Sequence, residues 1–184
     1  MKKNIIAVMV AATAVLSAQA FANNTTQLVI HGTVTDKDNS CNITPFGAIT
    51  GGTVILDDIT TAELNKLAIN TPASASAKDI TYKIEDCKQG GKDYVGDLSV
   101  NVSGNYVAGK ADILNNEAAN PAGNTGIALI NTDSTRVKFD GSSTTKVTYN
   151  ASNTLLSYKA AYVKTAETAT AGDVKGVATF TITY

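Results

Sequence analysis

The sequence predicts an all-β domain, a sandwich of short strands, and three observations lead to that prediction. The chain is rich in Thr, Val and Asn, with 14 glycines, 3 prolines and no Trp, a composition typical of short strands joined by tight turns. About nine segments alternate apolar and polar residues, as a strand with one buried face requires. Only one segment has a helical pattern. No internal repeat or linker divides the chain, so a single sandwich is expected.

The first 22 residues have the pattern of a cleaved secretory signal. Lysines at residues 2–3 precede an apolar run over residues 5–16, and Ala-Phe-Ala at residues 20–22 supplies the small residues that signal peptidase recognises. A run of roughly 12 residues is too short to span about 30 Å of hydrocarbon as a helix, which argues against a membrane anchor. Cleavage after this motif would make Asn23 the mature start, and Ala-Gln-Ala at residues 18–20 is a competing cleavage site.

The mature chain is long enough for one domain with a hydrophobic core. Removing 22 of 184 residues leaves 162, a common size for a single domain. Two lysines leave with the signal, so 13 basic residues remain against 16 acidic ones, a net charge of −3. Without a basic cluster, we expect no nucleic-acid partner. No later segment is apolar for long enough to cross a bilayer, so a soluble exported protein is expected.

The first predicted strand covers residues 26–34. Its alternation places four apolar or small residues on one face: Leu28, Ile30, Gly32 and Val34. A polar turn over residues 36–40 separates this strand from Cys41. The strand therefore lies on an extension at the N-terminal side of the fold.

Two cysteines follow the signal, and we expect them to form a disulfide. Export would bring Cys41 and Cys87 into an oxidising compartment, where disulfides persist. The 45 residues between them are too many for a C-x-x-C redox or metal motif. A bond closing a loop of this length would stabilise the fold by roughly 4 kcal/mol in the chain-entropy model. The alternative is two separate buried thiols.

One short helix is predicted after a short buried strand at residues 53–56. Thr60 and Glu63 have the spacing of a capping box, in which each side chain bonds the other residue's backbone N–H. Leu64 and Leu67 then share one helical face. Pro72 and the small residues after it limit this helix to about two turns.

The later strands are predicted from alternation and from the turn residues between them. The segment from 115 to 124 contains Pro121 and Gly123 and is predicted as a loop, and Asp140-Gly141 as a turn. The predicted strands are residues 80–84, 98–102, 126–130, 137–139, 147–149, 156–162 and 178–184.

Both ends are unusual for a self-contained sandwich. The last apolar strand, with Ala178, Phe180 and Ile182 on one face, ends at the terminal Tyr184 with no later strand to cover it. An uncovered strand presents unpaired backbone groups and can pair with another chain. The sequence therefore predicts a subunit that is incomplete alone.

Three groups of residues resemble the type 1 fimbrial major-subunit family. The first is Cys41 together with Ile-Thr-Tyr-Lys-Ile-Glu-Asp-Cys at residues 80–87. The second is Pro-Ala-Gly-Asn-Thr-Gly-Ile-Ala-Leu at residues 121–129, and the third runs from Tyr-Lys-Ala-Ala-Tyr at 158–162 to Ala-Thr-Phe-Thr-Ile-Thr-Tyr at 178–184. The resemblance covers essentially the whole mature chain.

The tail is the most specific part of the resemblance. The family carries a glycine fourteenth from the end and a tyrosine next to last, whereas Gly172 is thirteenth and Tyr184 is last. Both positions are therefore offset by the same single residue. The family also has a glycine in the middle of its N-terminal extension, where this chain has Thr26, so the register of individual donor residues stays open.

The resemblance implies an immunoglobulin-like β-sandwich that lacks its final strand and is completed by donor-strand exchange. It divides the chain into a signal peptide (1–22), a donor-strand extension (23–35) and an incomplete pilin domain (36–184). In the extension the donor residues would be Leu28, Ile30, Gly32 and Val34. In the domain the strand facing the groove would carry Gly172, Ala178, Phe180, Ile182 and Tyr184.

The resemblance also implies partners and a location. A periplasmic chaperone would lend a strand to the groove and deliver the subunit to an outer-membrane usher. Identical or related pilins would then polymerise into an adhesive fimbria on the cell surface, which could carry the contact with a host receptor. The alternative is a single-domain adhesive or minor tip subunit that binds a host carbohydrate or receptor.

Candidate chemistry is weak. His31 is the single histidine and has no second histidine or cysteine pair near it, so it makes a poor metal ligand. Acid pairs such as Asp57-Asp58 and Glu85-Asp86 fit solvated turns better than a glycosidase pair, which needs a cleft. We therefore expect no enzyme, no catalytic residue, no metal and no cofactor.

Overall fold

The computed structural model describes residues 27–32, 39–47, 52–151 and 153–183. These residues contain twelve strands, one α-helix and one short 3₁₀ helix. The strands are β1 (Gln27–Gly32), β2 (Asn39–Phe46), β3 (Thr53–Ile55), β4 (Lys78–Gln89), β5 (Lys92–Asp93), β6 (Gly96–Gly104), β7 (Tyr106–Val107), β8 (Lys110–Leu114), β9 (Thr125–Asn131), β10 (Asp140–Tyr149), β11 (Thr154–Lys164) and β12 (Lys175–Thr183). The helices are α1 (Thr61–Lys66) and η1 (Ser74–Ser76).

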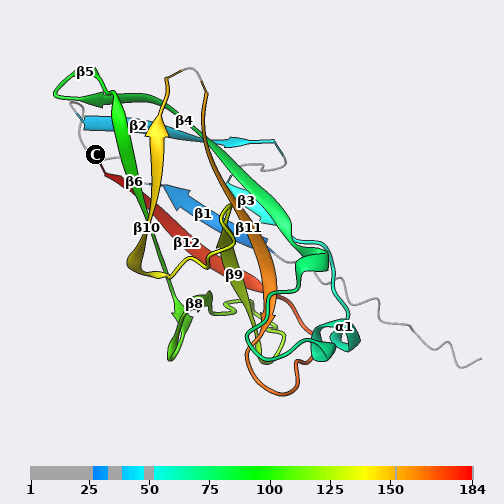
Figure 1. Cartoon of the computed structure of the whole chain (residues 1–184). Helices are drawn as coiled ribbons and strands as arrows, with labels where there is room; N and C mark the ends of the chain where they lie inside the picture. Colours follow the sequence, from blue (N-terminus) through cyan, green and yellow to red (C-terminus); the bar gives the residue numbers. More distant parts are fainter. Residues whose placement is uncertain (1–26, 33–38, 48–51, 152, 184) are drawn as a thin grey trace, which may run out of the picture.

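The strands form two sheets. One has five strands in the order β10-β6-β12-β1-β3, and the other runs β2-β4-β11-β9-β8-β7, with β5 paired to β4. Strand β12 runs antiparallel to β6 on one side and parallel to β1 on the other. Figure 1 shows α1 at one end of the molecule and the C-terminus at the opposite end. The prediction of an all-β domain is confirmed.

The core lies between the two sheets and comes from the predicted alternation. The inward residues of β6 are almost fully buried, as are those of β4 and β11. Phe180 of β12 joins the layers, because its ring centroid lies 5.7 Å from that of Tyr82 and 5.5 Å from that of Tyr158. Aromatic pairs at this separation add specific geometry to the burial of apolar area.

The helix begins as its sequence predicts. The Glu63 N–H donates to Thr60 Oγ1 at 3.1 Å, and the Thr60 N–H donates to the Glu63 carboxylate at 3.0 Å. This is the reciprocal pair of a capping box. Leu64 is the buried residue of the helix.

Three features of the chain differ from the prediction. The segment before and after Cys41 is strand β2, at the edge of its sheet, where Pro45 is tolerated because an edge strand need not donate every hydrogen bond. The short strands β5, β7 and β8 have too few alternating residues to be recognised. Residues 137–139 are not a strand, although Val137 and Phe139 are buried. Their N–H groups donate singly to Leu129 and Ala111, so the segment crosses between two strands without pairing along either.

The predicted signal (1–22), Thr26, Val34 and Tyr184 lie outside the described residues. Within the described part of the chain, no helix has the length and apolar character needed to cross a membrane.

Candidate functional site: the position between strands β12 and β3

The strand from the N-terminal segment lies inside the chain's own sheet. β1 pairs in parallel with β12 over six residues, from Gln27 opposite Lys175 to Gly32 opposite Phe180. On its other edge it pairs antiparallel with β3 over three residues. We call the position between Lys175–Phe180 and Thr53–Ile55 the β1 site. Figure 1 shows β1 between β12 and β3.

The β1 site is bordered by buried apolar residues of its two neighbouring strands. In β12, Ala178 is 0% exposed and Phe180 is 2% exposed, whereas Thr179 between them is half-buried. Near β3, the side chains of Val54 and Leu56 are buried in the same core cluster. A strand in the β1 site therefore has apolar neighbours on the inner face and backbone partners on both edges.

A cavity lies near the end of the β1 site where β12 begins. It has a volume of about 260 Å³ and lies beside α1 and the residues that lead into β12. Its walls include Thr60, Leu64, Ala122, Tyr162, Gly172 and Val174. Gln27 lies opposite Lys175, the first residue of β12. Val174, which lines the cavity, comes immediately before Lys175. The cavity therefore lies beyond the Gln27 end of the β1 site.

Gly172 shapes one wall of this cavity. Its φ angle is +155°, a conformation that side-chain-bearing residues rarely adopt. A Cβ atom there would lie 2.5 Å from the Ala122 nitrogen and 2.6 Å from the Pro121 carbonyl carbon. The Ala122 N–H donates to the Asp173 carbonyl at 2.8 Å, which holds the two segments together. Glycine is therefore required for this close approach.

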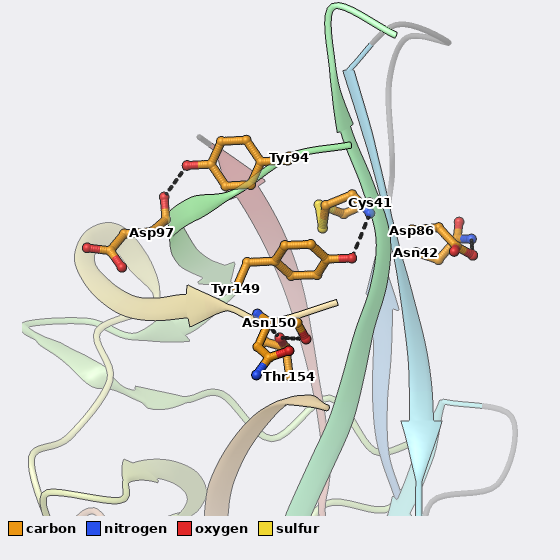
Figure 2. The surroundings of a disulfide bond; sticks show 9 residues. Cys41, Asn42, Asp86, Tyr94, Asp97, Tyr149, Asn150 and Thr154 are labelled. Atoms are coloured by element: carbon orange, nitrogen blue, oxygen red, sulfur yellow. Dashed lines mark hydrogen bonds between the residues drawn. A yellow bond between two sulfur atoms is a disulfide. The ribbon is translucent and has the colours of Figure 1, made fainter. Parts of the chain in front are cut away.

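The disulfide lies near the opposite end of the sandwich. Cys41 and Cys87 are bonded, with a sulfur–sulfur distance of 2.05 Å, which confirms the predicted pair and excludes two free thiols. Figure 2 shows Tyr149 directed at the backbone beside this bond, where the Cys87 N–H donates to Tyr149 Oη at 3.2 Å. The Tyr94 hydroxyl donates to the Asp97 carbonyl at 2.7 Å. The disulfide and the Tyr149 hydrogen bond tie β2, β4 and β10 together.

Burial changes the pKa of two tyrosines and one arginine in the fold. Burial raises the pKa of Tyr158 to about 12, and a hydrogen bond with Thr145 opposes this shift. Burial also raises the pKa of Tyr82, whose hydroxyl has no hydrogen-bond partner among the described residues. Burial lowers the pKa of Arg136, and the nearby Asp112 carboxylate, 3.2 Å from Nη1, opposes this shift. None of these groups lines the cavity.

The acidic residues considered from the sequence make structural contacts. Asp57 pairs with Lys78 at 2.8 Å, and Glu85 pairs with Lys83 at 2.6 Å. Asp86 accepts a hydrogen bond from Asn42. The described residues contain no group of three or more His, Cys, Asp or Glu that could hold a metal ion. His31 lies in β1 with its backbone opposite Thr179.

A comparison of the sequence with models of known protein families shows to which family this chain belongs. The model of the fimbrial protein family matches residues 28–184. The chain belongs to the fimbrial protein family. Members of this family are structural subunits of surface pili, so the chain is a pilus subunit that assembles with other pilins. No curated protein sequence gave a significant match.

Solved structures of pilus subunits share the fold of this fimbrial protein. The P pilus rod subunit PapA matches with a TM-score of 0.59 and 20% identity, over 78% of this chain and 98% of PapA. A chaperone–usher pilus structure that addresses rod uncoiling matches with a TM-score of 0.59 and 23% identity, over 84% of this chain and 91% of that one. The chain spans 32% of the CupB6 tip adhesin from Pseudomonas aeruginosa, with a TM-score of 0.49 and 21% identity. The fold is therefore the immunoglobulin-like sandwich of chaperone–usher pilins.

The predicted site residues fall into three places in this fimbrial protein. Leu28, Ile30 and Gly32 lie in β1, with backbones opposite Gly176, Ala178 and Phe180. Ala178, Phe180 and Ile182 lie in β12 as predicted. Gly172 lies in the preceding loop, beside the cavity, and not in the strand.

Two features of the site were not predicted. The short strand β3 forms the second edge of the β1 site, and three residues carry too little alternation to reveal this role. The cavity joins Thr60, Ala122 and Gly172, which are far apart in the sequence, so no local pattern could have revealed it.

Proposed function

We propose that this pilin is a structural subunit of an adhesive fimbria and polymerises by donor-strand exchange. In an assembled fibre, the N-terminal extension (23–35) of one subunit would fill the β1 site of the next. Strand addition to a sheet edge is a known mode of recognition, and pilin complementation is one of its recognised examples. Backbone hydrogen bonds give affinity, and alternate side chains set the register.

The observation that carries this proposal is the position of β1. One edge of β12 pairs with β6, and its other edge pairs with β1 from Lys175 to Phe180. Strand β1 comes from the N-terminal part of the chain. It is joined to the rest of the domain only through residues 33–38. A strand that is joined to its domain by one short connection can be exchanged for an equivalent strand from another subunit.

The same argument supports a chaperone and an usher as partners. When β1 is absent, six residues of β12 and three of β3 lose their strand neighbour. Such an edge aggregates unless it is covered. A periplasmic chaperone that lends a strand would protect the subunit after export, and an outer-membrane usher would receive it for assembly at the cell surface.

The presence of both halves of the joint in one chain supports a position in the shaft of the fibre. A subunit that donates an extension and also accepts one forms a head-to-tail interface, which generates open fibres without limit. Immunogold labelling along the whole fimbria is expected. Label confined to the tip would instead indicate the adhesive or minor tip subunit.

The test compares two charges on adjacent residues of β1. Ile30 lies opposite the buried Ala178, whereas His31 lies opposite the half-buried Thr179. Because neighbouring residues of a strand point to opposite faces, Ile30→Asp should place a carboxylate on the inner face, at a cost of several kcal/mol. Ile30→Asp should abolish the ladder of heat-sensitive polymers on unboiled gels, while His31→Asp should leave it normal.

Chaperone co-purification is measured for the same two variants. Both should be exported, form the disulfide and bind the chaperone, because the chaperone uses the domain and not the extension. Normal ladders from Ile30→Asp would remove β1 from the donor role.

A further inference from the structure

Tyr82 carries a buried hydroxyl that the fold does not use. The residue is 4% exposed, and within the described residues its Oη has no hydrogen-bond partner. Tyr158 on the neighbouring strand β11 is also buried, but its hydroxyl donates to Thr145 Oγ1 of β10 at 3.3 Å. An unpaired buried hydroxyl destabilises a protein, so Tyr82 points to a partner that is supplied in another state of the molecule.

Tyr82 lies on the strand that faces β1. The hydrogen bond between Tyr158 and Thr145 places β10, at one edge of its sheet, over β11. The ring of Phe180 in β12 contacts the rings of both Tyr158 in β11 and Tyr82 in β4. Strand β1 is the next strand after β12, so it faces β4. Tyr82 therefore lies at the end of the β1 site where Gly32 is opposite Phe180.

Residue size is matched across the β1 site. Each large residue of one strand lies opposite a small residue of the other: Leu28 opposite Gly176, Ile30 opposite Ala178, and Gly32 opposite Phe180. Cores pack well when large and small residues alternate across facing positions. The residue paired with Phe180 is thus a glycine, which has no side chain that could bond the Tyr82 hydroxyl.

An extension from another subunit can enter the same site in the opposite direction. It is not joined to this domain through residues 33–38, and antiparallel pairing is slightly more stable per residue than parallel pairing. The antiparallel register that keeps large residues opposite small ones is the following: Ile30 opposite Gly176, Leu28 opposite Ala178, and Thr26 opposite Phe180. Thr26 precedes Leu28 by two residues and so shares its face of the strand. This register replaces Gly32 with a hydroxyl-bearing residue beside Tyr82.

We propose that Tyr82 is a specificity-determining residue of assembly, and that its hydroxyl donates a hydrogen bond to the hydroxyl of Thr26 in the incoming extension. This inference rests on the proposed function, in which the extension of one subunit fills the β1 site of the next. A strand with an apolar residue at this position leaves the Tyr82 hydroxyl unpaired. The site therefore discriminates against such a strand.

A double-mutant cycle across the joint tests this contact. Full-length chains with Tyr82→Phe, with Thr26→Val and with both are polymerised, and the rate at which unboiled ladders dissociate in detergent is measured at one fixed temperature. Each single variant leaves one buried hydroxyl unpaired, so its polymers should dissociate roughly tenfold faster than the wild type. The double variant removes both hydroxyls and should dissociate within about threefold of the wild-type rate.

The matched control is Thr25→Val. Thr25 is the same type of residue one position earlier, and alternation places it on the opposite face of the strand. Thr25→Val should leave the dissociation rate unchanged, both alone and combined with Tyr82→Phe. Unfolding of the monomer is the second readout, because its Tyr82 hydroxyl is already unpaired. Tyr82→Phe should therefore weaken the polymer without lowering the stability of the monomer.

The outcomes separate this inference from the proposed function. Additive effects of Tyr82→Phe and Thr26→Val, equal coupling with Thr25→Val, or a matching loss of monomer stability would overturn the contact between Tyr82 and Thr26. The proposed function would still stand if Ile30→Asp abolishes the ladders. Normal ladders from Ile30→Asp would instead contradict the proposed function and this inference together.

Discussion

Two buried tyrosines show how a single hydroxyl group affects this fold. Tyr82 and Tyr149 are both buried in the core cluster. The Tyr149 hydroxyl accepts the N–H of the almost fully buried Cys87, whereas the Tyr82 hydroxyl has no hydrogen-bond partner within the described residues. A buried polar atom without a hydrogen-bond partner destabilises a protein. Removing one partner of a buried hydrogen bond leaves the other atom in that unpaired state.

The same substitution at these two tyrosines should have different effects. Tyr149→Phe leaves the Cys87 N–H unpaired and should lower the free energy of unfolding by about 1–3 kcal/mol. Tyr82→Phe removes an unpaired hydroxyl and should leave stability unchanged or raise it. Urea unfolding with the disulfide intact measures both. Equal losses would show that ring packing, and not hydrogen bonding, decides the result.

A second prediction concerns the wall of the cavity. Gly172→Ala places a Cβ within 2.5 Å of the Ala122 backbone and should cost roughly 2–4 kcal/mol of stability. Gly109→Ala is the matched control, because Gly109 also has a positive φ, +74°, but has no atom within 4 Å of the added Cβ. The control should lose only about 1 kcal/mol, from backbone strain. A loss at Gly172 no greater than at Gly109 would contradict the close approach.

Among the elements, the helix α1 is short but well specified. Its capping box gives the Glu63 carboxylate two hydrogen bonds from Thr60, one from the hydroxyl at 2.7 Å and one from the backbone. These bonds favour the charged form and lower the pKa of Glu63 below its ordinary value of 4.5. A group whose pKa falls on folding stabilises the protein above its unfolded pKa and loses that effect as pH falls.

The pH dependence of stability can test this capping box. The difference in unfolding free energy between wild type and Glu63→Gln should be full above pH 4.5 and shrink as pH falls through the lower pKa of the folded state. In a Thr60→Ala background, the same comparison should depend less on pH, because one hydrogen bond to the carboxylate is gone. Identical pH dependence in both backgrounds would remove Thr60 as the cause.

Long alternating strands were predictable, whereas the short strands β5, β7 and β8 were not recognised. Ile80, Tyr82 and Ile84 alternate within a twelve-residue strand, so one buried face is visible in the sequence. A short strand at residues 53–56 was predicted, but the place of β3 beside β1 depends on a contact across the fold. The cavity wall at Gly172 likewise depends on the distant Ala122.

For the whole molecule, the sequence indicated an incomplete sandwich but not which strand fills it. The apolar alternation of β12 predicted a strand in need of a partner. The alternation of Leu28 and Ile30 predicted a strand able to pair, but alternation carries no information about which molecule receives that strand. The structure places β1 in its own domain, and assembly would move it to a neighbour's.

The central claim is that one subunit's extension fills another subunit's β1 site, and mixed polymers test it most directly. A subunit with Ile30→Asp keeps its own β1 site but has an extension that cannot fill a neighbour's site. It should therefore accept one extension and then end the fibre. Wild-type subunits mixed with increasing fractions of Ile30→Asp should give progressively shorter fibres by electron microscopy, each with the variant at one end only. Fibres of unchanged length, or fibres carrying the variant throughout, would contradict the account.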